Sequence, residues 1–504
     1  MPRPQRVPPC VLAGLADLLG LPDAGPGAAT VVTGVTHASG QVRPGDLYAA
    51  LPGQHYHGAQ FVPAVAAAGA AAVLTDPAGA SAVATAGLPA LVVPDPRARL
   101  GEVAARVYGD PTVRLPVIGI TGTAGKTTTA YLIEAGLRSA GRTPAMLGTV
   151  ETRLGELTID SVRTTPEATD LQALLAVALE HGVDAVAMEV SSHALALDRV
   201  GGIRFAVGGW TNVGQDHLDF HPGPAAYFAA KARLFDGRCR VEVLNHDEPA
   251  LKPLVRPETV TYSAAGDPAA TWYASGVTEA GYGQRFTAHG PGTTRPASVC
   301  LPGRHNVANA LLAVAALVAI GVAAPAAVAG VATRLGVPGR LERVGDGPVL
   351  GVVDYAHKPD SIEAVLAALR PVAGAGGRLI CLIGAGGERD TGKRPLMGAA
   401  AARGADLVIV TDDNPRTEDP AEIRAGVLAG ARGVPGAQVR EVAGRRAAIE
   451  QAVRLAVPGD VIALLGKGHE RGQELADRVE PFDDRTALAE ALAARWADQE
   501  ERAR

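Results

Sequence analysis

Cysteine and basic charge are both scarce in this chain of 504 residues. The four cysteines lie far apart and include no Cys-x-x-Cys pair: Cys10, Cys239, Cys300 and Cys381. That spacing argues against a zinc ribbon or a disulfide framework and fits a reducing cytoplasm. The formal net charge of -5 and the pI near 6.2 leave no basic excess of the kind that binds a nucleic-acid backbone. We therefore expect small molecules, and no nucleic acid, as partners.

The sequence predicts neither an export signal nor a membrane-spanning segment. The apolar stretch near the N-terminus is interrupted by prolines and by Asp17, and no clean cleavage pattern follows it. Residues 307–332 carry no charge and are long enough on paper to cross a bilayer. This segment is rich in alanine and contains Gly321 and Pro325, which favours two buried helices joined by a turn. We expect no membrane span, a cytoplasmic location and a monomer.

Apolar strands that end in polar residues occur throughout the chain, in three groups separated by prolines and glycines. Pro111 and Pro116 bracket the first predicted linker, and a second cluster of glycines and prolines spans 336–348. Such nearly uniform apolar strands are typical of parallel sheets covered by helices on both faces. With ~150 residues per domain as a prior, the sequence predicts an α/β protein with three domains: a small N-terminal α/β domain over 1–112, a central parallel-sheet domain over 113–342 and a C-terminal Rossmann-like domain over 343–504.

A glycine-rich stretch, GITGTAGKTTT, follows an apolar strand and precedes a predicted helix. Gly122 and Gly125 let backbone N–H groups turn towards a phosphate, and the helix N-terminus adds its dipole. Lys126 can reach the β- and γ-phosphates, and the Thr127 hydroxyl can hold Mg²⁺. The general pattern would place glycine at position 120, where this chain has Ile120. The stretch predicts ATP binding, and kinase, ATPase, switch and ligase all remain open.

The shortened loop G-T-x-G-K-T-T is the first of a series of motifs that run in order through all three predicted domains. The others are TTPEA (164–168), MEVSSHAL (188–195), TNVGQDHLDFH (211–221), YFAAKARLF (227–235), GRHNVANA (303–310), DYAHKPD (354–360), GERDTGKRPLMG (387–398), DNPRTEDP (413–420) and GKGHE (466–470). Together they resemble the Mur ligases, and within that family the members that add the third amino acid of the peptidoglycan stem peptide. No single motif is as specific as the set.

The resemblance implies an ATP-dependent ligase that adds meso-diaminopimelate to the D-glutamyl γ-carboxylate of UDP-MurNAc-L-Ala-D-Glu through an acyl phosphate. It implies an N-terminal domain that binds the UDP substrate, a central domain that binds ATP and a C-terminal domain that binds the amino acid. Three alternatives stay open: a lysine-adding ligase of the same type, a ligase similar to folylpolyglutamate synthase, and a non-enzymatic P-loop switch. The switch leaves the ligand-facing strand ends of the other domains without a purpose.

ATP and Mg²⁺ are the cofactors that the resemblance implies. The implied ATP-binding residues are Gly122, Thr123, Ala124, Gly125, Lys126, Thr127, Thr128, Asn306, Asn309, Arg340 and Asp354. The implied metal ligands are Thr127, Glu189, His217 and Lys231, the last as a carbamate, and Lys126, Lys231 and His217 are the implied catalytic residues. Each has a plainer interpretation: Glu189 as a helix-capping acid, His217 as a satisfied loop histidine, Lys231 as an unmodified lysine with a packed stem and Asn309 as an ordinary helix residue.

Hydroxyl groups and an arginine suit the phosphate and carboxylate oxygens of the UDP-MurNAc-dipeptide. For this substrate the resemblance implies Thr164, Thr165, Ser191 and Arg199, with a uridine pocket formed by His37, Ser39, Gln54, His55 and Tyr56. Two departures affect this set. Leu197 stands where relatives often carry glutamine, and the family's Asp-Ser-Arg becomes Ala38-Ser39-Gly40, so only the serine remains.

The arginine of Asp-Asn-Pro-Arg, Arg416, points to the amino-acid substrate. Diaminopimelate differs from lysine by one distal carboxylate, and a planar guanidinium can bind a carboxylate through two hydrogen bonds. Lysine-adding relatives usually lack this arginine, so the resemblance implies that Arg416 selects diaminopimelate. A solvated loop remains the plainer interpretation of the same stretch. The implied diaminopimelate-binding residues are Arg389, Asp413, Asn414, Pro415, Arg416, Thr417, Gly466 and Glu470.

Overall fold

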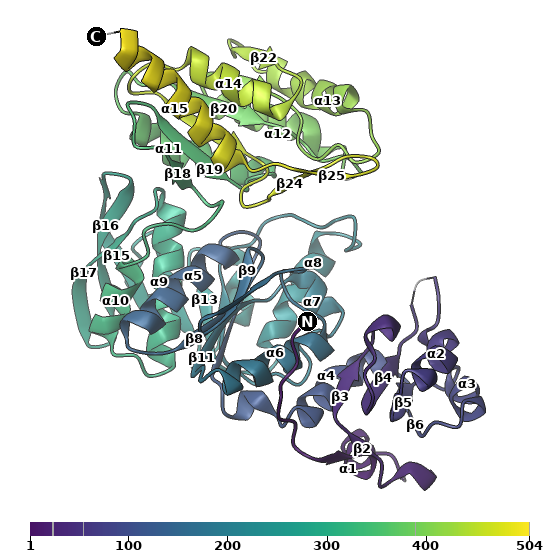
Figure 1. Cartoon of the computed structure of the whole chain (residues 1–504). Coiled ribbons are helices and arrows are strands. Elements are labelled where there is room, and N and C mark those ends of the chain that lie inside the picture. Colours follow the sequence, from purple (N-terminus) through teal and green to yellow (C-terminus); the bar gives the residue numbers. More distant parts are fainter. Residues whose placement is uncertain (23–24, 54, 389, 503–504) are drawn as a thin grey trace.

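Three successive α/β sheets organise the chain, each with its own helices (Figure 1). The structure, a computed structural model, describes residues 1–22, 25–53, 55–388 and 390–502. In Figure 1 the central sheet lies between the N-terminal unit and the C-terminal unit. The α/β class predicted from the apolar strands is confirmed.

The N-terminal unit is built on a four-stranded parallel sheet in the order β3-β4-β5-β6. The strands are β3 (Gly34–Thr36), β4 (Asp46–Ala50), β5 (Ala72–Thr75) and β6 (Ala90–Val92), beside a small ladder of β1 (Cys10–Val11) and β2 (Val31–Val32). The helices are α1 (Leu12–Leu19), α2 (Val62–Ala67), α3 (Ala80–Thr85) and α4 (Pro96–Val107). Helix α4 begins where Asp95 accepts a hydrogen bond from the backbone of Ala98, with proline at the first helical position.

The central sheet has eleven strands in the order β10-β9-β8-β11-β7-β12-β13-β14-β15-β16-β17. The strands are β7 (Val117–Thr121), β8 (Pro144–Leu147), β9 (Glu151–Leu154), β10 (Leu157–Asp160), β11 (Ala185–Glu189), β12 (Phe205–Trp210), β13 (Cys239–Asn245), β14 (Val260–Ser263), β15 (Trp272–Ala280), β16 (Gly283–Gly290) and β17 (Thr293–Val299). The helices are α5 (Lys126–Ser139), α6 (Ala168–Glu180), α7 (Ser192–Ala196), α8 (Pro224–Ala232), α9 (Arg304–Ala319) and α10 (Ala324–Ala332). From β8 through β15 neighbouring strands pair in parallel, and antiparallel hairpins extend both ends.

The C-terminal sheet has the order β18-β19-β23-β20-β21-β22, parallel except for β18. The strands are β18 (Glu342–Val344), β19 (Leu350–Asp354), β20 (Leu379–Ile383), β21 (Leu407–Val410), β22 (Val439–Glu441) and β23 (Val461–Leu465), with a separate hairpin of β24 (Gly472–Glu474) and β25 (Val479–Pro481). The helices are α11 (Pro359–Ala373), α12 (Lys393–Gly404), α13 (Pro420–Arg432), α14 (Arg445–Leu455) and α15 (Asp484–Arg502). Every residue of β20, β21 and β23 is buried, as expected for strands with helices on both faces.

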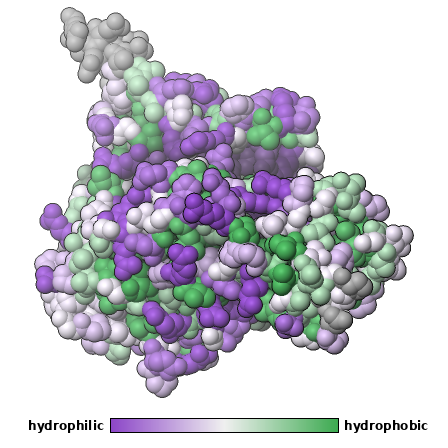
Figure 2. All heavy atoms as spheres, turned by 60° about the horizontal axis from the view of Figure 1, so that its bottom comes forward, coloured by the Kyte–Doolittle hydropathy of each residue, from purple (hydrophilic) through white to green (hydrophobic). Residues whose placement is uncertain are grey.

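The uncharged segment 307–332 lies in helices α9 and α10, joined by a short turn at Gly321, as predicted. Within the described ranges, no helix is both long enough and apolar enough to cross a bilayer. On the face drawn in Figure 2, hydrophilic and hydrophobic residues are interspersed. The four cysteines are free thiols.

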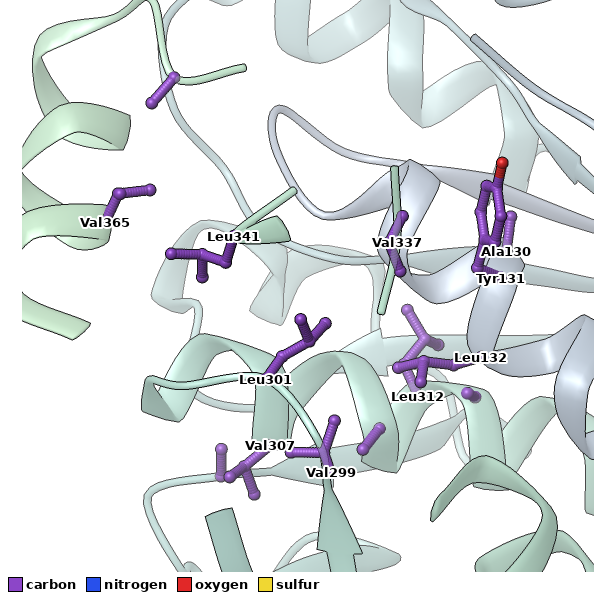
Figure 3. Packing of buried hydrophobic residues seen from close by; sticks show 14 of the residues in the cluster. Ala130, Tyr131, Leu132, Val299, Leu301, Val307, Leu312, Val337, Leu341 and Val365 are labelled. Carbon is purple, nitrogen blue, oxygen red and sulfur yellow. The ribbon is translucent and has the colours of Figure 1, made fainter. Parts of the chain in front are cut away.

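One apolar cluster runs from the central unit into the C-terminal unit. Figure 3 shows its members Leu132 and Leu312 in helices of the central unit, with Leu301, Leu341 and Val365 nearer the C-terminal unit. Because interiors are close-packed, a cluster that crosses between units restrains how they sit relative to one another. The linker that contains Leu341 is therefore part of the core.

Candidate active site

The glycine-rich loop joins β7 to α5, as the sequence predicts. Gly122 and Gly125 have backbone φ angles of 135° and 85°, which favour glycine. A Cβ atom at Gly125 would lie 2.5 Å from the Asn309 side-chain oxygen, so the loop passes close to α9. The loop is held from β12 by Asn212, whose side chain accepts from the Ala124 amide (3.0 Å) and donates to the Ala124 carbonyl (3.0 Å). The N-terminus of α5 thus faces an open cavity with its loop fixed.

Lys126, the first residue of α5, folds back over this loop. Its ammonium group donates hydrogen bonds to the carbonyls of Gly122 (2.8 Å) and Thr123 (3.2 Å). Burial and the nearby Lys358 cation lower the pKa of Lys126 to about 8, so the amine remains mostly protonated near neutral pH. These contacts hold a cation where the distal phosphates of a nucleotide would approach the loop.

Glu189 ends β11, which pairs with β7 so that Glu189 lies opposite Ile120, just before the loop. Its carboxylate is 1% exposed and accepts from the Thr149 amide at 2.8 Å, with the Thr149 hydroxyl 3.0 Å from the other oxygen. No cation lies within ion-pair distance of Glu189 among the described residues. Buried charges in proteins are paired or coordinate metals, so this carboxylate fits a metal ion that enters from the cavity.

Lys231 lies on α8 and is 2% exposed. Its Nζ atom donates to the Thr123 hydroxyl (2.9 Å) and lies 3.6 Å from the centroid of the Tyr227 ring. Burial, together with the Lys126 and Lys358 cations, lowers the pKa of Lys231 to about 5. In the described part of the chain no carboxylate lies within ion-pair distance of it. The buried amine is therefore neutral near pH 7 and lies against the glycine-rich loop.

His217 lies in the loop after β12 with a left-handed backbone (φ 52°). Its ring is 3.1 Å from Asp216 and packs edge-on against His193, with the centroids 4.6 Å apart. Asp216 also forms an ion pair of 2.5 Å with Lys358, which precedes α11 in the C-terminal unit. Burial raises the pKa of Asp216, but the neighbouring Lys358 and His217 outweigh burial, and the net pKa lies below its usual range. The Asp216–Lys358 pair thus joins the central and C-terminal units beside the glycine-rich loop.

A cavity of about 420 Å³ opens at the loop. Its polar lining includes the loop from Gly122 to Thr128 together with Thr164, Glu189, Ser191, His217, Lys231, Asn306, Asn309, Arg340 and Asp354. Its apolar wall includes Leu301, Leu341 and Val365, which face one another across the space in Figure 3. The structure therefore brings together all the residues predicted to bind ATP and metal.

Within this cavity, several of the predicted nucleotide contacts also hold the protein together. The Asn309 side chain donates to Asn306 at 3.1 Å, on one face of α9 as the spacing predicts. The Arg340 guanidinium donates to the Thr127 hydroxyl at 3.2 Å and lies over the Tyr355 ring. The two oxygens of Asp354 accept from the Leu341 and Ala356 amides, each at 2.7 Å. These last two bonds fix the linker between the units.

The residues predicted to bind the UDP substrate are distributed between two units. Thr164 and Ser191 line the first cavity, whereas Thr165 is fully buried and donates to the Glu189 carbonyl at 2.9 Å. Arg199 forms an ion pair with Glu167 at 2.8 Å.

In the N-terminal unit, His37 lies 3.1 Å from the hydroxyl of Thr169 on α6, which links that unit to the central one. Ser39 begins a short 3-10 helix, and the rings of His55 and Tyr56 contact edge-on at 6.4 Å, with Tyr56 well exposed. Gln54 lies outside the described residues.

A second cavity of about 600 Å³ adjoins the first and shares Asp216, His217 and Lys358 with it. It is also lined by Asp413, Asn414, Arg416, Gly466 and Glu470, five of the residues predicted to bind diaminopimelate. Pro415 and Thr417 flank Arg416 in the chain, and the Thr417 hydroxyl donates to Glu388. Arg389 lies outside the described residues.

The floor of this second cavity is organised by a fully buried lysine, Lys467. Its ammonium group donates to Asn414 (2.9 Å) and to Glu470 (3.3 Å), and lies 3.5 Å from Asp413. Asn414 in turn donates to Glu470 at 2.9 Å. Burial and the neighbouring Asp413 raise the pKa of Glu470. A cation with no exposed surface thus fixes three polar side chains that face the cavity.

Arg416 lies at the carboxyl end of β21, as predicted, with a left-handed backbone (φ 51°). Its Nε atom is 2.6 Å from the Glu474 carboxylate, and its NH1 group donates to the Gly387 carbonyl at 2.7 Å. Arg416 also lines the second cavity. The arginine is therefore held in one orientation by the protein and is not a freely solvated loop side chain.

Comparison with known proteins identifies the family. Three family models match in succession: "Mur ligase family, catalytic domain" over residues 31–108, "Mur ligase middle domain" over 120–317 and "Mur ligase, glutamate ligase domain" over 339–468. UDP-N-acetylmuramoyl-L-alanyl-D-glutamate--2,6-diaminopimelate ligase from Streptomyces coelicolor is 54% identical over 97% of this chain and 98% of the relative. The protein of that name from Streptomyces avermitilis is 53% identical over 97% and 98%. The chain belongs to the Mur ligase family.

A solved structure of a UDP-N-acetylmuramoyl-L-alanyl-D-glutamate--2,6-diaminopimelate ligase matches this Mur ligase with a TM-score of 0.70 and 31% identity. It covers 97% of this chain and 100% of that chain. The likeness therefore extends over all three units. It confirms the predicted three-domain architecture of a Mur ligase.

Three charged residues of this Mur ligase site were not assigned from sequence: Asp216, Lys358 and Lys467. Two are lysines inside quoted motifs, DYAHKPD and GKGHE, and Asp216 directly precedes His217. A lysine shortly after an apolar strand in both motifs was the available signal. The partner of each lysine could not be predicted from the sequence, because the ion pair of Lys358 joins two units and the contacts of Lys467 join two loops.

Proposed function

We propose that this Mur ligase adds meso-diaminopimelate to the D-glutamyl γ-carboxylate of UDP-MurNAc-L-Ala-D-Glu, with ATP as the energy source. The observation that carries the proposal is the pair of adjoining cavities: one is built on the phosphate loop, and the other presents Arg416. The names of the full-length relatives at 53% and 54% identity support the same substrates. The proposed domain boundaries are those predicted: 1–112, 113–342 and 343–504.

The first chemical step is phosphoryl transfer. An oxygen of the substrate carboxylate attacks the γ-phosphorus of ATP, ADP leaves, and an acyl phosphate forms. This chemistry needs positioning and charge neutralisation more than covalent help from the protein. Lys126 and the amides at the start of α5 supply positive charge at the loop, and Arg340, which donates to Thr127, extends it across the cavity.

Mg²⁺ fits the residues that face this cavity. Glu189 is a buried carboxylate with no cationic partner among the described residues, and the Thr127 hydroxyl lies in the same lining. No cluster of three or more His, Cys, Asp or Glu able to hold a metal occurs in the part of the chain that the structure describes. A site with one carboxylate suits Mg²⁺, which takes its other oxygens from nucleotide phosphates and water. When bound, the ion would neutralise charge that develops on the phosphates.

Lys231 suits carbamylation. Its buried amine is held neutral, the form that adds to CO₂, and forming the N–C bond releases one proton to solvent. The carbamate would replace an amine among cations with an anion, which offsets Lys126 and Lys358 and provides oxygens for a metal. His217 lines the same cavity and would be a metal ligand beside the carbamate of Lys231.

The second step joins the amine to the acyl phosphate. The amine attacks the acyl carbon, inorganic phosphate leaves, and the nitrogen loses one proton. The second cavity holds the amino acid, with Glu470 as an acceptor for an ammonium group, Asn414 orienting Glu470 by a hydrogen bond, and Arg416 as the partner of the distal carboxylate. Asp216 and Lys358, which line both cavities, keep the two halves of the reaction side by side. The four free thiols and a nucleotide-linked substrate support a cytoplasmic reaction.

Replacing Arg416 with alanine tests the choice of amino acid. The KM for meso-diaminopimelate is expected to rise about 30-fold, since a hydrogen bond to a charged group is worth ~2 kcal/mol. The KM values for ATP and for the UDP-muramoyl dipeptide should stay within about twofold. Lysine, which lacks the distal carboxylate, should be a poor substrate of the wild type and lose little more in the variant.

Steady-state kinetics with both amino acids on both proteins form a cycle in which only the carboxylate–guanidinium pair differs. Arginine and alanine carry a similar strain at the left-handed backbone of position 416, so that contribution cancels. Equal losses with the two amino acids would assign Arg416 to the loop and remove it from substrate recognition.

A further inference from the structure

The β24–β25 hairpin forms hydrogen bonds with the loop that carries Arg416. The backbone amide of Arg416 donates to the Glu474 carbonyl at 3.1 Å, and the Glu474 amide donates to the Asn414 side chain at 3.0 Å. The Gln473 side chain donates to the Asp413 carbonyl. Above these contacts, the Glu474 carboxylate forms its 2.6 Å ion pair with Nε of Arg416. The hairpin therefore fixes both the backbone and the side chain of the arginine.

The two partners of the Arg416 side chain lie outside the lining of the ligand space. Arg416 belongs to the lining of the second cavity, whereas Glu474 and Gly387, its two side-chain partners, do not. The Glu474 carboxylate lies 2.6 Å from Nε in an ion pair, and the Gly387 carbonyl accepts one hydrogen of NH1. Among the described residues, the terminal nitrogens make no other hydrogen bond or ion pair, which leaves NH2 and the second hydrogen of NH1 open to a ligand. Two parallel donors on the terminal nitrogens are the arrangement that binds a carboxylate bidentately.

We propose that Glu474 is a positioning residue that orients Arg416 to receive the distal carboxylate of the amino-acid substrate. The inference rests on the proposed function and deepens it. Arginine carries a large rotamer entropy, and restraining it before the ligand arrives removes part of the cost of binding. If Glu474 instead occupied the place of the substrate carboxylate, it would line the cavity. Glu474 is not part of the cavity lining.

This role needs an acceptor at Nε more than it needs a negative charge. Glutamine at position 474 keeps a carbonyl oxygen that can accept from Nε, while alanine keeps nothing. Glu474 is about half exposed (47%), so neither substitution buries an unpaired group. We expect Glu474→Ala to raise the KM for meso-diaminopimelate about fivefold to tenfold, the scale of ordering one long side chain on binding. Glu474→Gln should stay within about twofold of the wild type.

The experiment measures kcat and KM for all three substrates of the full-length enzyme, in the wild type, Glu474→Ala and Glu474→Gln. The same hairpin offers a matched control, Glu480→Ala, because Glu480 is also about half exposed and pairs with an arginine, Arg478, at 2.8 Å. We expect only Glu474→Ala to change a KM, and only that for diaminopimelate, with kcat and the thermal midpoint unchanged. In an Arg416→Ala background the same substitution should have no further effect, because the group it positions is gone.

Three results would overturn the proposal. A lower KM in Glu474→Ala would make Glu474 a competitor of the substrate, and an equal rise in every KM would make it a structural residue. A loss that persists in the Arg416→Ala background would mean that Glu474 acts through another group. A wild-type enzyme that does not use diaminopimelate would contradict the proposed function itself, which the first measurement of the series distinguishes from a failure of Glu474.

Discussion

Replacing Lys126 with alanine is expected to lower the rate of ligation about 1000-fold or more, because the reaction loses the cation nearest the transferred phosphoryl group. Among the described residues, this ammonium group donates only to the loop carbonyls of Gly122 and Thr123, beside an open cavity. Its removal leaves those carbonyls accessible to water, so the fold should remain intact. The loss should appear in kcat, since the charge acts on the transition state more than on the bound substrates.

ADP formation in the presence of all three substrates measures the effect, and thermal unfolding checks the fold. Lys252→Ala is the matched control, because Lys252 is exposed and lines neither cavity. It should behave as the wild type. If Lys126→Ala retained more than half of the wild-type rate, Lys126 would have no part in handling the phosphate.

Replacing Lys231 with alanine should also abolish ligation, again by about 1000-fold, and added short-chain carboxylates should restore part of the activity. The reason is that a carbamate on Lys231 would be an anion in a buried site that otherwise faces Lys126 and Lys358. Formate or acetate can enter the space that the side chain vacates and supply carboxylate oxygens there. Restoration should saturate with carboxylate concentration, as expected for binding at one site.

Lys231→Arg is the informative companion, because arginine keeps a positive charge but cannot form the carbamate. It should be inactive and should not respond to carboxylates, since its side chain fills the space. Lys252→Ala again serves as the control for non-specific salt effects. Full activity in Lys231→Arg would rule out the carbamate and return Lys231 to the role of an ordinary packed lysine.

Structural features that depend on a few neighbouring residues could be predicted from the sequence. The phosphate loop needed only the spacing of two glycines, a lysine and a threonine between strand and helix, and the structure has that loop between β7 and α5. Glu189 at the end of an apolar strand was expected beside this loop, because parallel strands bring their carboxyl ends to one edge of a sheet. The two buried helices of 307–332 followed from alanine content and one glycine.

Contacts between distant segments could not be predicted in this way. The sequence places an arginine after a strand, but nothing local to Arg416 indicates that a hairpin near residue 474 holds it. The fully buried Lys467 and the Lys358–Asp216 pair were missed for the same reason. Asp354 was expected at the nucleotide, and the structure adds that both its oxygens accept backbone amides. Roles that depend on pairing across units require the fold.

The most direct test of the proposed function is the substrate requirement for ADP formation, measured with each substrate omitted in turn and with lysine in place of diaminopimelate. We expect multiple-turnover ADP formation only when ATP, UDP-MurNAc-L-Ala-D-Glu and meso-diaminopimelate are all present, with one tripeptide product per ADP by mass spectrometry. With lysine the rate should be at least about 30-fold lower than with meso-diaminopimelate, because lysine cannot form the bond of ~2 kcal/mol to Arg416. Multiple-turnover ADP formation without the dipeptide or the amino acid, or equal rates with lysine and diaminopimelate, would contradict the proposal.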